Sequence, residues 1–384
     1  PEHGAPYYII NFEEGQFTTS VTQGFSSRVV KIFRNVLVKN LSQEWRNLIK
    51  SIKEIESILR IKSLDLEFAI TKNNKILIFQ VRPLTSINQN FKIKNLETKI
   101  SRLIEQNKKH FSSLSKSKHL VGERTFFSDM SDWNPSEIIG NNPNLLDYSI
   151  YKFLITNDTW HRSRTLLGYH NAKPSQLMQK FGNKPYIDVK SSFNSLLPDN
   201  LSNIIKKKLM KYYLHRLENN PYLHDKVEFE ILFTCYDFTI DSRLKVLENY
   251  GFTRNEIMQI KSSLIIITKN ILNNFSIILS SCNDSLMKLL TKRELILSES
   301  SNSSNSYKDL LISAEKLLLD CKKYGTLPFS IMARIGFIGT ILLRSLQNMK
   351  IFEKKFYDNF MNSITTPLTE IQNDVSDFKK KKIS

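Results

Sequence analysis

Two stretches of alternating residue character, Leu64–Thr71 and Ile76–Pro83, constrain the fold of this chain more than any other feature. Side chains alternate between the two faces of a β-strand, so each stretch predicts a strand with one apolar face. The residues between them include Asn73 and Asn74, and asparagine tolerates the left-handed backbone of a tight turn. We therefore expect an antiparallel β-hairpin that ends at Pro83, because proline cannot donate to the ladder.

A turn centred on Asn73 and Asn74 determines which residues lie opposite one another. The pairs expected on the apolar face, which must be buried, are Ile70 with Leu77, Phe68 with Phe79, and Leu66 with Val81. On the opposite face, Glu67 is expected across from Gln80, and Asp65 across from Arg82. The residues expected to continue this second face towards the turn are Ala69 and Ile78.

The polar face of the predicted hairpin has two interpretations. Carboxylates such as Asp65 and Glu67 are hard oxygen ligands that suit Mg²⁺, an ion that binds together with substrate phosphates. The guanidinium of Arg82 suits a phosphate oxygen, and Gln80 can bond to either partner. The other interpretation is a surface hairpin with a cross-strand ion pair that contributes little to stability. Residue chemistry alone leaves both open.

The two strands also carry a family resemblance. The segments Asp65–Ala69 and Phe79–Pro83 together resemble the motif that closes the ATP-grasp-type domain of phosphoenolpyruvate synthase, pyruvate phosphate dikinase and rifampin phosphotransferase. The resemblance implies that Glu67 contacts Mg²⁺ and ATP, and that Gln80 and Arg82 face the phosphates of the nucleotide. Asp65 belongs to the same predicted Mg-ATP-binding set.

The resemblance implies an ATP-dependent kinase or phosphotransferase that uses Mg²⁺ with ATP. In phosphoenolpyruvate synthase, ATP and pyruvate give phosphoenolpyruvate, AMP and phosphate through a phosphohistidine. The acceptor expected here is pyruvate or another small molecule with a hydroxyl or enolate group.

We also expect the chain to be a fragment. No Gly-rich phosphate-covering loop with a lysine precedes the hairpin, and the histidines lack the Gly/Thr/Ser-rich approach of a phosphocarrier. The phosphohistidine is therefore expected on a domain that this sequence does not include, with no catalytic residue in the chain itself. We expect that the chain alone is not a competent catalyst.

A second group of polar and aromatic residues follows the hairpin. The segments Asp129–Pro135 and Tyr186–Val189 are similar to a phosphoenolpyruvate synthase-like branch of the same family. The residues of the candidate acceptor pocket are Asp132, Trp133, Asn134, Arg162 and Arg164. In this interpretation the arginines hold a carboxylate or phosphate, and Asp132 and Asn134 orient it. The alternative is that the tryptophans are core residues, Asn134 begins a helix at Pro135, and Asp188 pairs with an arginine.

Length and periodicity predict two domains, because 384 residues exceed what one compact core usually contains. The expected fold is α/β, an ATP-grasp-like C-terminal portion with antiparallel strands, followed by a mainly α-helical domain. Strands are predicted at Tyr7–Phe12 and Arg28–Phe33, and a helix is predicted from Ser42 onwards. The expected boundaries are 1–90 for the nucleotide-binding portion, 91–125 for a helical linker and 126–384 for the helical domain.

The net charge of +18 permits a rival function, a basic helical protein that binds nucleic acid. The lysines are scattered along the whole chain, which argues against a nucleic-acid footprint, and the same charge attracts an anionic substrate such as ATP. A second rival is a non-catalytic relative that binds nucleotide or serves as a scaffold.

The cysteines and the apolar segments bear on the location of the protein. Cys235, Cys282 and Cys321 are far apart in sequence, which fits neither a disulfide framework nor a zinc site and favours a reducing, cytoplasmic setting. The segment considered as a candidate membrane span, Ser262–Ile278, is interrupted by polar residues, so we expect a core helix and no membrane partner.

Overall fold

The structure is a computed structural model that describes residues 7–13, 28–61, 63–84, 96–114, 120–301, 306–365 and 367–379. It divides into two compact units, Pro1–Gln106 (unit 1) and Asn107–Ser384 (unit 2). Helices predominate and the sheets are small and antiparallel, in agreement with an α/β portion followed by a mainly helical one. The boundary between the units lies in α2 (Leu96–Leu114), inside the stretch 91–125.

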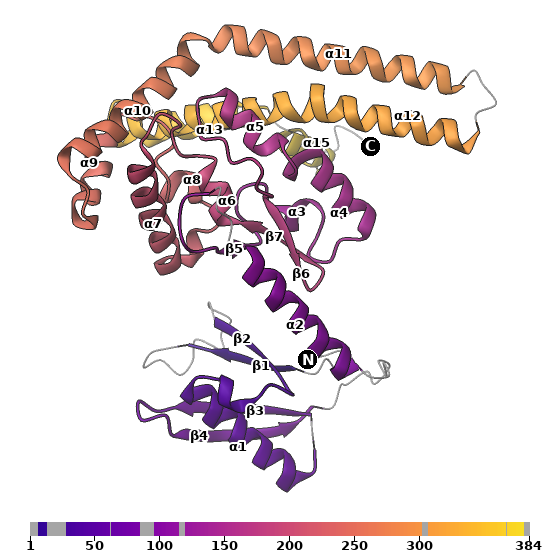
Figure 1. Cartoon of the computed structure of the whole chain (residues 1–384), viewed down its shortest axis with the longest axis vertical. Helices are drawn as coiled ribbons and strands as arrows, with labels where there is room; N and C mark the ends of the chain where they lie inside the picture. The colour runs from indigo at the N-terminus through magenta and orange to yellow at the C-terminus, as the bar shows by residue number, and fades with distance from the viewer. Residues whose placement is uncertain are drawn as a thin grey trace. The chain divides into compact units, whose positions relative to one another are not determined.

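In its described residues, unit 1 contains two antiparallel strand pairs, the helical elements between them and the first part of α2 (Figure 1). Its elements are β1 (Tyr7–Phe12), β2 (Arg28–Phe33), the 3₁₀ helix η1 (Val38–Asn40), α1 (Gln43–Leu59), β3 (Leu64–Ile70) and β4 (Ile76–Pro83). β1 pairs with β2 and β3 pairs with β4, so the strands predicted from residue type are confirmed.

The core of unit 1 forms between its strands and α1. Ser42 is the N-cap of α1 in an extended conformation, and Arg60 ends the helix in the left-handed region. The buried face of α1 is Leu48, Ile49 and Ile52, which follow the helical period of the sequence. The residues that meet this face from the strands are Tyr8, Ile10, Ile32, Leu66, Phe68 and Ile76.

The register of the hairpin agrees with the sequence prediction only in its half distant from the turn. Glu67 pairs with Gln80, Asp65 with Arg82, and Leu66 with Val81, as predicted. Asn74 occupies the left-handed region, with φ of 57°, as the predicted turn requires.

Nearer the turn, the ladder shifts between Glu67 and Phe68, so that Phe68 pairs with Ile78 and Ile70 with Ile76. The pairing predicted for Phe79 and Leu77 is therefore wrong, and so is their burial, since Phe79 is 66% exposed and Leu77 38%. Ile78 is half-buried and does not continue the polar face. The physical reason is a β-bulge, because one extra residue in β4 reverses which side chains face the core.

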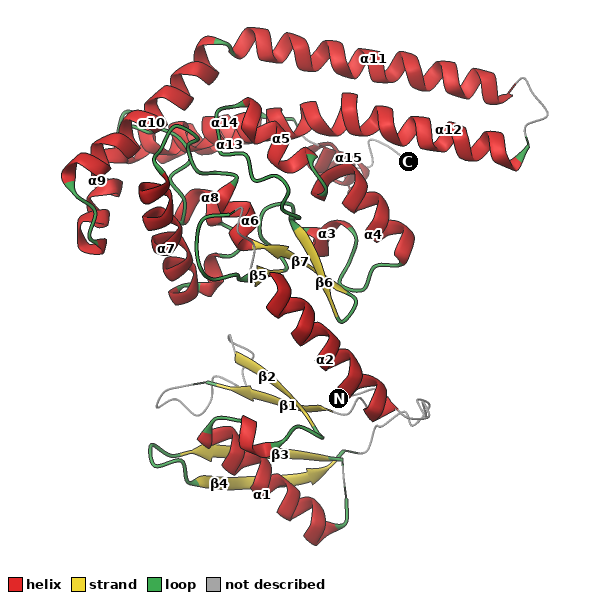
Figure 2. Ribbon diagram, in the orientation of Figure 1, coloured by secondary structure: helices red, strands yellow, loops and turns green. Residues whose placement is uncertain are grey.

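The first part of unit 2 combines a small sheet with short helices (Figure 2). The sheet has the strand order β5-β7-β6, with β5 (Phe127–Ser128), β7 (Lys184–Asp188) and β6 (Met178–Phe181). The helical segments are α3 (Pro135–Ile138), α4 (Leu145–Tyr151), the π-helical turn η2 (Lys152–Thr156), α5 (Thr159–Leu166) and α6 (Val189–Asn194). The C-terminal part of α2 contacts this sheet, since Phe111 lies 5.6 Å from Phe127 between ring centroids.

The rest of unit 2 is helical. Its elements are α7 (Asn203–Asn219), the 3₁₀ helix η3 (Pro221–Leu223), α8 (Val227–Glu230), α9 (Ile240–Leu244), the 3₁₀ helix η4 (Lys245–Tyr250), α10 (Arg254–Asn273), α11 (Phe275–Ser301), α12 (Tyr307–Asp320), the π-helical turn η5 (Cys321–Thr326), α13 (Leu327–Asn348), α14 (Lys354–Ser363) and α15 (Pro367–Lys379). α11 and α12 form a long antiparallel helical hairpin (Figure 1). Thr253 and Glu256 form a capping box that begins α10, which buries Ile260, Leu264 and Ile267 as a core helix does.

Within the part of the chain that the structure describes, one helical run, Tyr307–Asn348, is long and apolar enough to cross a membrane by length and composition. A core helix of a globular domain can pass the same test. Ser330 and Arg334 of this run are buried inside unit 2, where Arg334 forms an ion pair with Glu228 and donates to Thr234 Oγ1 over 2.9 Å. α10 and α11 pass the test only as a pair bent by 61°.

Candidate functional site

The hairpin of unit 1 brings Asp65, Glu67 and Arg82 into direct contact. Arg82 Nη2 donates to Asp65 Oδ2 and to Glu67 Oε1, each over 3.2 Å. The three side chains are about half exposed, at 54% for Arg82, 50% for Asp65 and 48% for Glu67. Gln80, opposite Glu67, is also exposed. We call these four residues the polar face.

The polar face has the composition of a site for a hard cation with its anion. Two carboxylates share one guanidinium, so the group carries an excess negative charge, and its oxygens remain open to solvent. Exposed ion pairs of this kind contribute at most about 1 kcal/mol to stability, so Arg82 can exchange its partners at little cost. Asp65 and Glu67 fit Mg²⁺ as oxygen ligands only with further oxygens from phosphate and water. Among the residues that the structure describes, no group of three or more His, Cys, Asp or Glu could hold a metal ion.

In the second predicted cluster, Asp132 and Arg164 bind one another. Arg164 donates from Nη1 to Asp132 Oδ2 over 3.0 Å and from Nη2 to Oδ1, and their side chains are only 6% and 4% exposed. Ser192 Oγ donates to Asp132 Oδ2 over 2.6 Å, and Arg164 also donates to Ser195 Oγ over 2.6 Å. This buried network links the segment before α3 with α5 and with the end of α6, so its groups are directed at one another and away from solvent.

The neighbours of this pair are also placed as structural residues. Trp160 is fully buried, and Trp133 packs against the cluster around it. Asn134 has a φ of 40° and is the N-cap residue of α3, with Pro135 at the first helical position. Asp188 does not pair with an arginine, because its carboxylate caps α6 by accepting from the Ser191 N–H and Oγ.

Burial raises the pKa of Asp188 to about 6, against hydrogen bonds from Ser191 that lower it. The neighbouring Lys190 is also buried, and burial lowers its pKa. Both shifts favour the neutral forms, as is expected where a charge leaves water.

Arg162 is separated from Arg164 by the geometry of α5. Residues two positions apart on a helix do not share a face, so Arg164 points into the core while Arg162 is exposed. Arg162 lines a cavity of about 330 Å³ together with Lys292, Lys322, Lys323 and other residues. Sequence analysis did not predict the three lysines as site residues. The run Lys322–Tyr324 is a basic segment that the sequence shows, but Arg162 and Lys292, which line the same cavity, lie far from it in the sequence.

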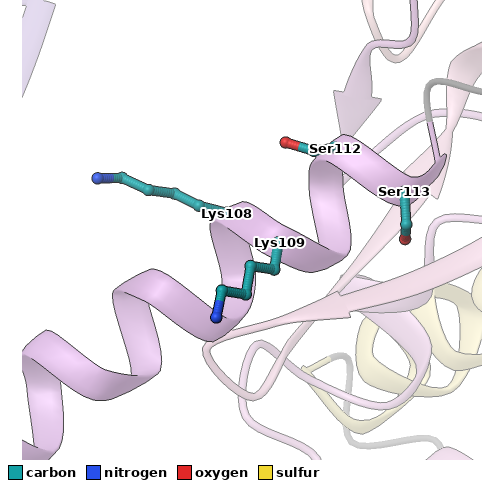
Figure 3. Close-up of a pocket in the computed structure, with 4 residues that line it drawn as sticks. All are labelled: Lys108, Lys109, Ser112 and Ser113. Atoms are coloured by element: carbon teal, nitrogen blue, oxygen red, sulfur yellow. The ribbon is translucent and has the colours of Figure 1, made fainter.

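Unit 2 has two other hollows. A groove of about 1050 Å³ beside α7 is lined by Lys207, Lys208 and Lys211 and by the ion pair between Arg124 and Glu218, and Lys208 donates to Glu256 over 2.7 Å. A shallow hollow lies on α2 (Figure 3), where Lys108 and Lys109 point in different directions and no other element contributes a side chain.

No protein-family model, curated protein or solved structure matched this chain in the comparisons made.

Proposed function

We propose that unit 1 binds the magnesium complex of ATP through the polar face, as part of an ATP-dependent phosphotransferase of the phosphoenolpyruvate synthase type. The observation that supports this most is the register of the hairpin, which sets Glu67 across from Gln80 and Asp65 across from Arg82. In this proposal the strand pairs and α1 are the C-terminal portion of an ATP-grasp-like domain.

Each residue of the polar face has a role in the proposal. Glu67 and Asp65 turn from Arg82 to Mg²⁺, and the released guanidinium binds a phosphate oxygen of the nucleotide. Gln80 donates to a phosphate oxygen or accepts from a water on the metal. Phe79 is exposed next to Gln80 and offers an aromatic surface to the base.

Phosphoryl transfer depends mainly on positioning and on neutralising charge, which these groups would supply. The phosphoryl group would then be carried on a histidine outside this sequence to pyruvate or to another small hydroxyl or enolate acceptor. Because the proposal assigns no catalytic residue to this chain, binding rather than turnover is the property to measure on it.

The test is calorimetric titration of the whole chain with ATP in the presence and absence of Mg²⁺. Glu67→Gln and Arg82→Ala should each weaken Mg-ATP binding by about tenfold or more, because each removes a charge-assisted contact. Both side chains are exposed, so neither substitution should unfold the chain.

The chain contains a matched control in another exposed ion pair, between Arg124 and Glu218 at 3.2 Å. Arg124→Ala and Glu218→Gln should leave Mg-ATP affinity within about twofold of wild type, since neither residue belongs to the polar face and exposed pairs contribute little. Absence of Mg-ATP binding, or equal affinity in the hairpin variants and these controls, would show that the polar face is not a nucleotide site.

A further inference from the structure

The cavity beside Arg162 is formed where several helical segments of unit 2 meet. The start of α5 contributes Arg162, α11 contributes Lys292, and η5 contributes Lys322, Lys323 and Tyr324. Its volume of about 330 Å³ is at the lower end of the range for small-molecule sites, so it suits a ligand of a few carbon atoms or fewer.

The lining of this cavity carries an excess of positive charge. Its charged residues are Arg162, Lys292, Lys322, Lys323, Asp158 and Asp320, which sum to a net charge of +2. Lys292 Nζ donates to Asp320 Oδ1 over 2.9 Å, and Lys322 forms an ion pair with Asp158. The carboxylates are therefore engaged with two of the cations.

Arg162 and Lys323 provide the remaining charge. Neither forms an ion pair with a carboxylate within the part of the chain that the structure describes. A dianion placed between them would neutralise the excess charge and accept the guanidinium hydrogen bonds in a fork geometry.

The cations gather closely around one aromatic ring. The ammonium groups of Lys288, Lys292 and Lys323 lie 5.1, 5.4 and 5.0 Å from the ring centroid of Tyr324. The hydrogen bond with Lys323, and then the charges of Lys288 and Lys292, lower the pKa of Tyr324, so the field at this point favours negative charge. Like charges this close repel one another, and a bound anion relieves that repulsion.

The segment that presents Lys322 and Lys323 has an unusual backbone conformation. η5 is a π-helical turn that packs against the other π-helical turn, η2, and against α11. A Cβ atom at Gly325 would lie 2.9 Å from Leu289 Cδ2, so a larger residue there would require the Leu289 side chain to shift. Short π-helical insertions are rare and occur frequently at functional sites.

We propose that this cavity binds a phosphate group, either free phosphate or that of a small phosphomonoester, between Arg162 and Lys323. The proposal goes beyond the nucleotide-binding hairpin and does not depend on it, because all its residues belong to unit 2. It is based on two exposed side chains, Arg162 and Lys323, which line a cavity of net charge +2 and form no ion pair with a carboxylate among the described residues.

The test is calorimetric titration of the whole chain, without Mg²⁺ or nucleotide, with inorganic phosphate, with glycerol 3-phosphate and with uncharged glycerol. One of the two phosphates should bind and glycerol should not. Tighter binding of glycerol 3-phosphate identifies a phosphomonoester site, and binding of inorganic phosphate alone identifies a site for the free ion.

Arg162→Ala and Lys323→Ala should each weaken phosphate binding by about tenfold, because each removes one charge-assisted contact. Arg162→Lys should recover part of the loss, since it restores the charge but not the fork. Arg124→Ala, which removes an exposed arginine elsewhere in unit 2, is the matched control and should leave the affinity unchanged.

Equal weakening by Arg124→Ala and Arg162→Ala, or absence of binding of both phosphates, overturns the proposal. Binding of an RNA oligonucleotide that the Arg162 and Lys323 variants abolish, without binding of either phosphate, would also overturn it and make the cavity a nucleic-acid contact. Glu67→Gln should leave phosphate affinity unchanged. The phosphate site can therefore be tested separately from the proposed Mg-ATP site of the hairpin.

Discussion

Asp132→Asn tests whether the buried Asp132–Arg164 pair holds unit 2 together. The substitution removes one charge and keeps the size of the side chain. Asp132 has a φ of 56°, and asparagine tolerates that left-handed conformation, so backbone strain does not enter the comparison.

The expected magnitude follows from the burial of both partners. Asp132 accepts from Arg164 through both carboxylate oxygens and from Ser192, with 4% of its side chain exposed. In the variant, an amide NH₂ faces the guanidinium, which leaves a buried and uncompensated positive charge. Breaking a buried pair in this way costs about 3–5 kcal/mol, a large share of the free energy of unfolding of a typical domain.

Hydrogen exchange measured by mass spectrometry suits this test because the two units need not unfold together. Amides of α5 and α6 in the variant should lose protection equivalent to about 3–5 kcal/mol. Glu218→Gln is the control, since its exposed pair with Arg124 should contribute less than about 1 kcal/mol. If Asp132→Asn lowers the exchange protection no more than Glu218→Gln does, the Asp132–Arg164 pair does not stabilise unit 2, and the reasoning from burial is refuted.

Two further predictions concern pH and the core of unit 1. Because burial raises the pKa of Asp188 to about 6 from 3.8, the folded state binds its proton more tightly than the unfolded state. The free energy of unfolding should therefore fall by up to about 3 kcal/mol as pH rises from about 4 to about 6. Asp188→Asn keeps the helix cap, so the free energy of unfolding of this variant, measured with urea, should change less between pH 4.5 and pH 6.5 than that of the wild type. An equal change in the two proteins would contradict the prediction. Leu48→Ala should cost about 2–5 kcal/mol in the exchange protection of α1, while the exposed Phe79→Ser should cost under about 0.5 kcal/mol. Equal losses would contradict the bulged register.

The bulge in β4 shows where sequence reasoning about the hairpin stops. Alternation and the turn residues were sufficient to pair Glu67 with Gln80 and Asp65 with Arg82. The same alternation assigned Phe79 to the core because phenylalanine is apolar. An inserted residue is not visible in residue type, since it depends on how Ile76 packs against the core of unit 1.

The two arginines of α5 show the same limit at the second cluster. Their spacing places Arg162 and Arg164 on different faces of the helix, but spacing does not say which face is inside. The face of Arg164 is the buried one because Arg164 donates to Asp132, which also accepts a hydrogen bond from Ser192. Both of these residues lie far from Arg164 in the sequence.

The sequence by itself determined the strands of unit 1, the apolar face of α1 and the far half of the hairpin register, because these depend on periodicity and on nearest neighbours in the chain. Only the tertiary structure decided that Arg164 is a core residue and that Arg162 belongs to a cationic cavity with Lys292 and Lys323. Charge pairing acts over a few ångströms in space and has no period along the chain, so a pattern of residues cannot reveal which distant groups meet.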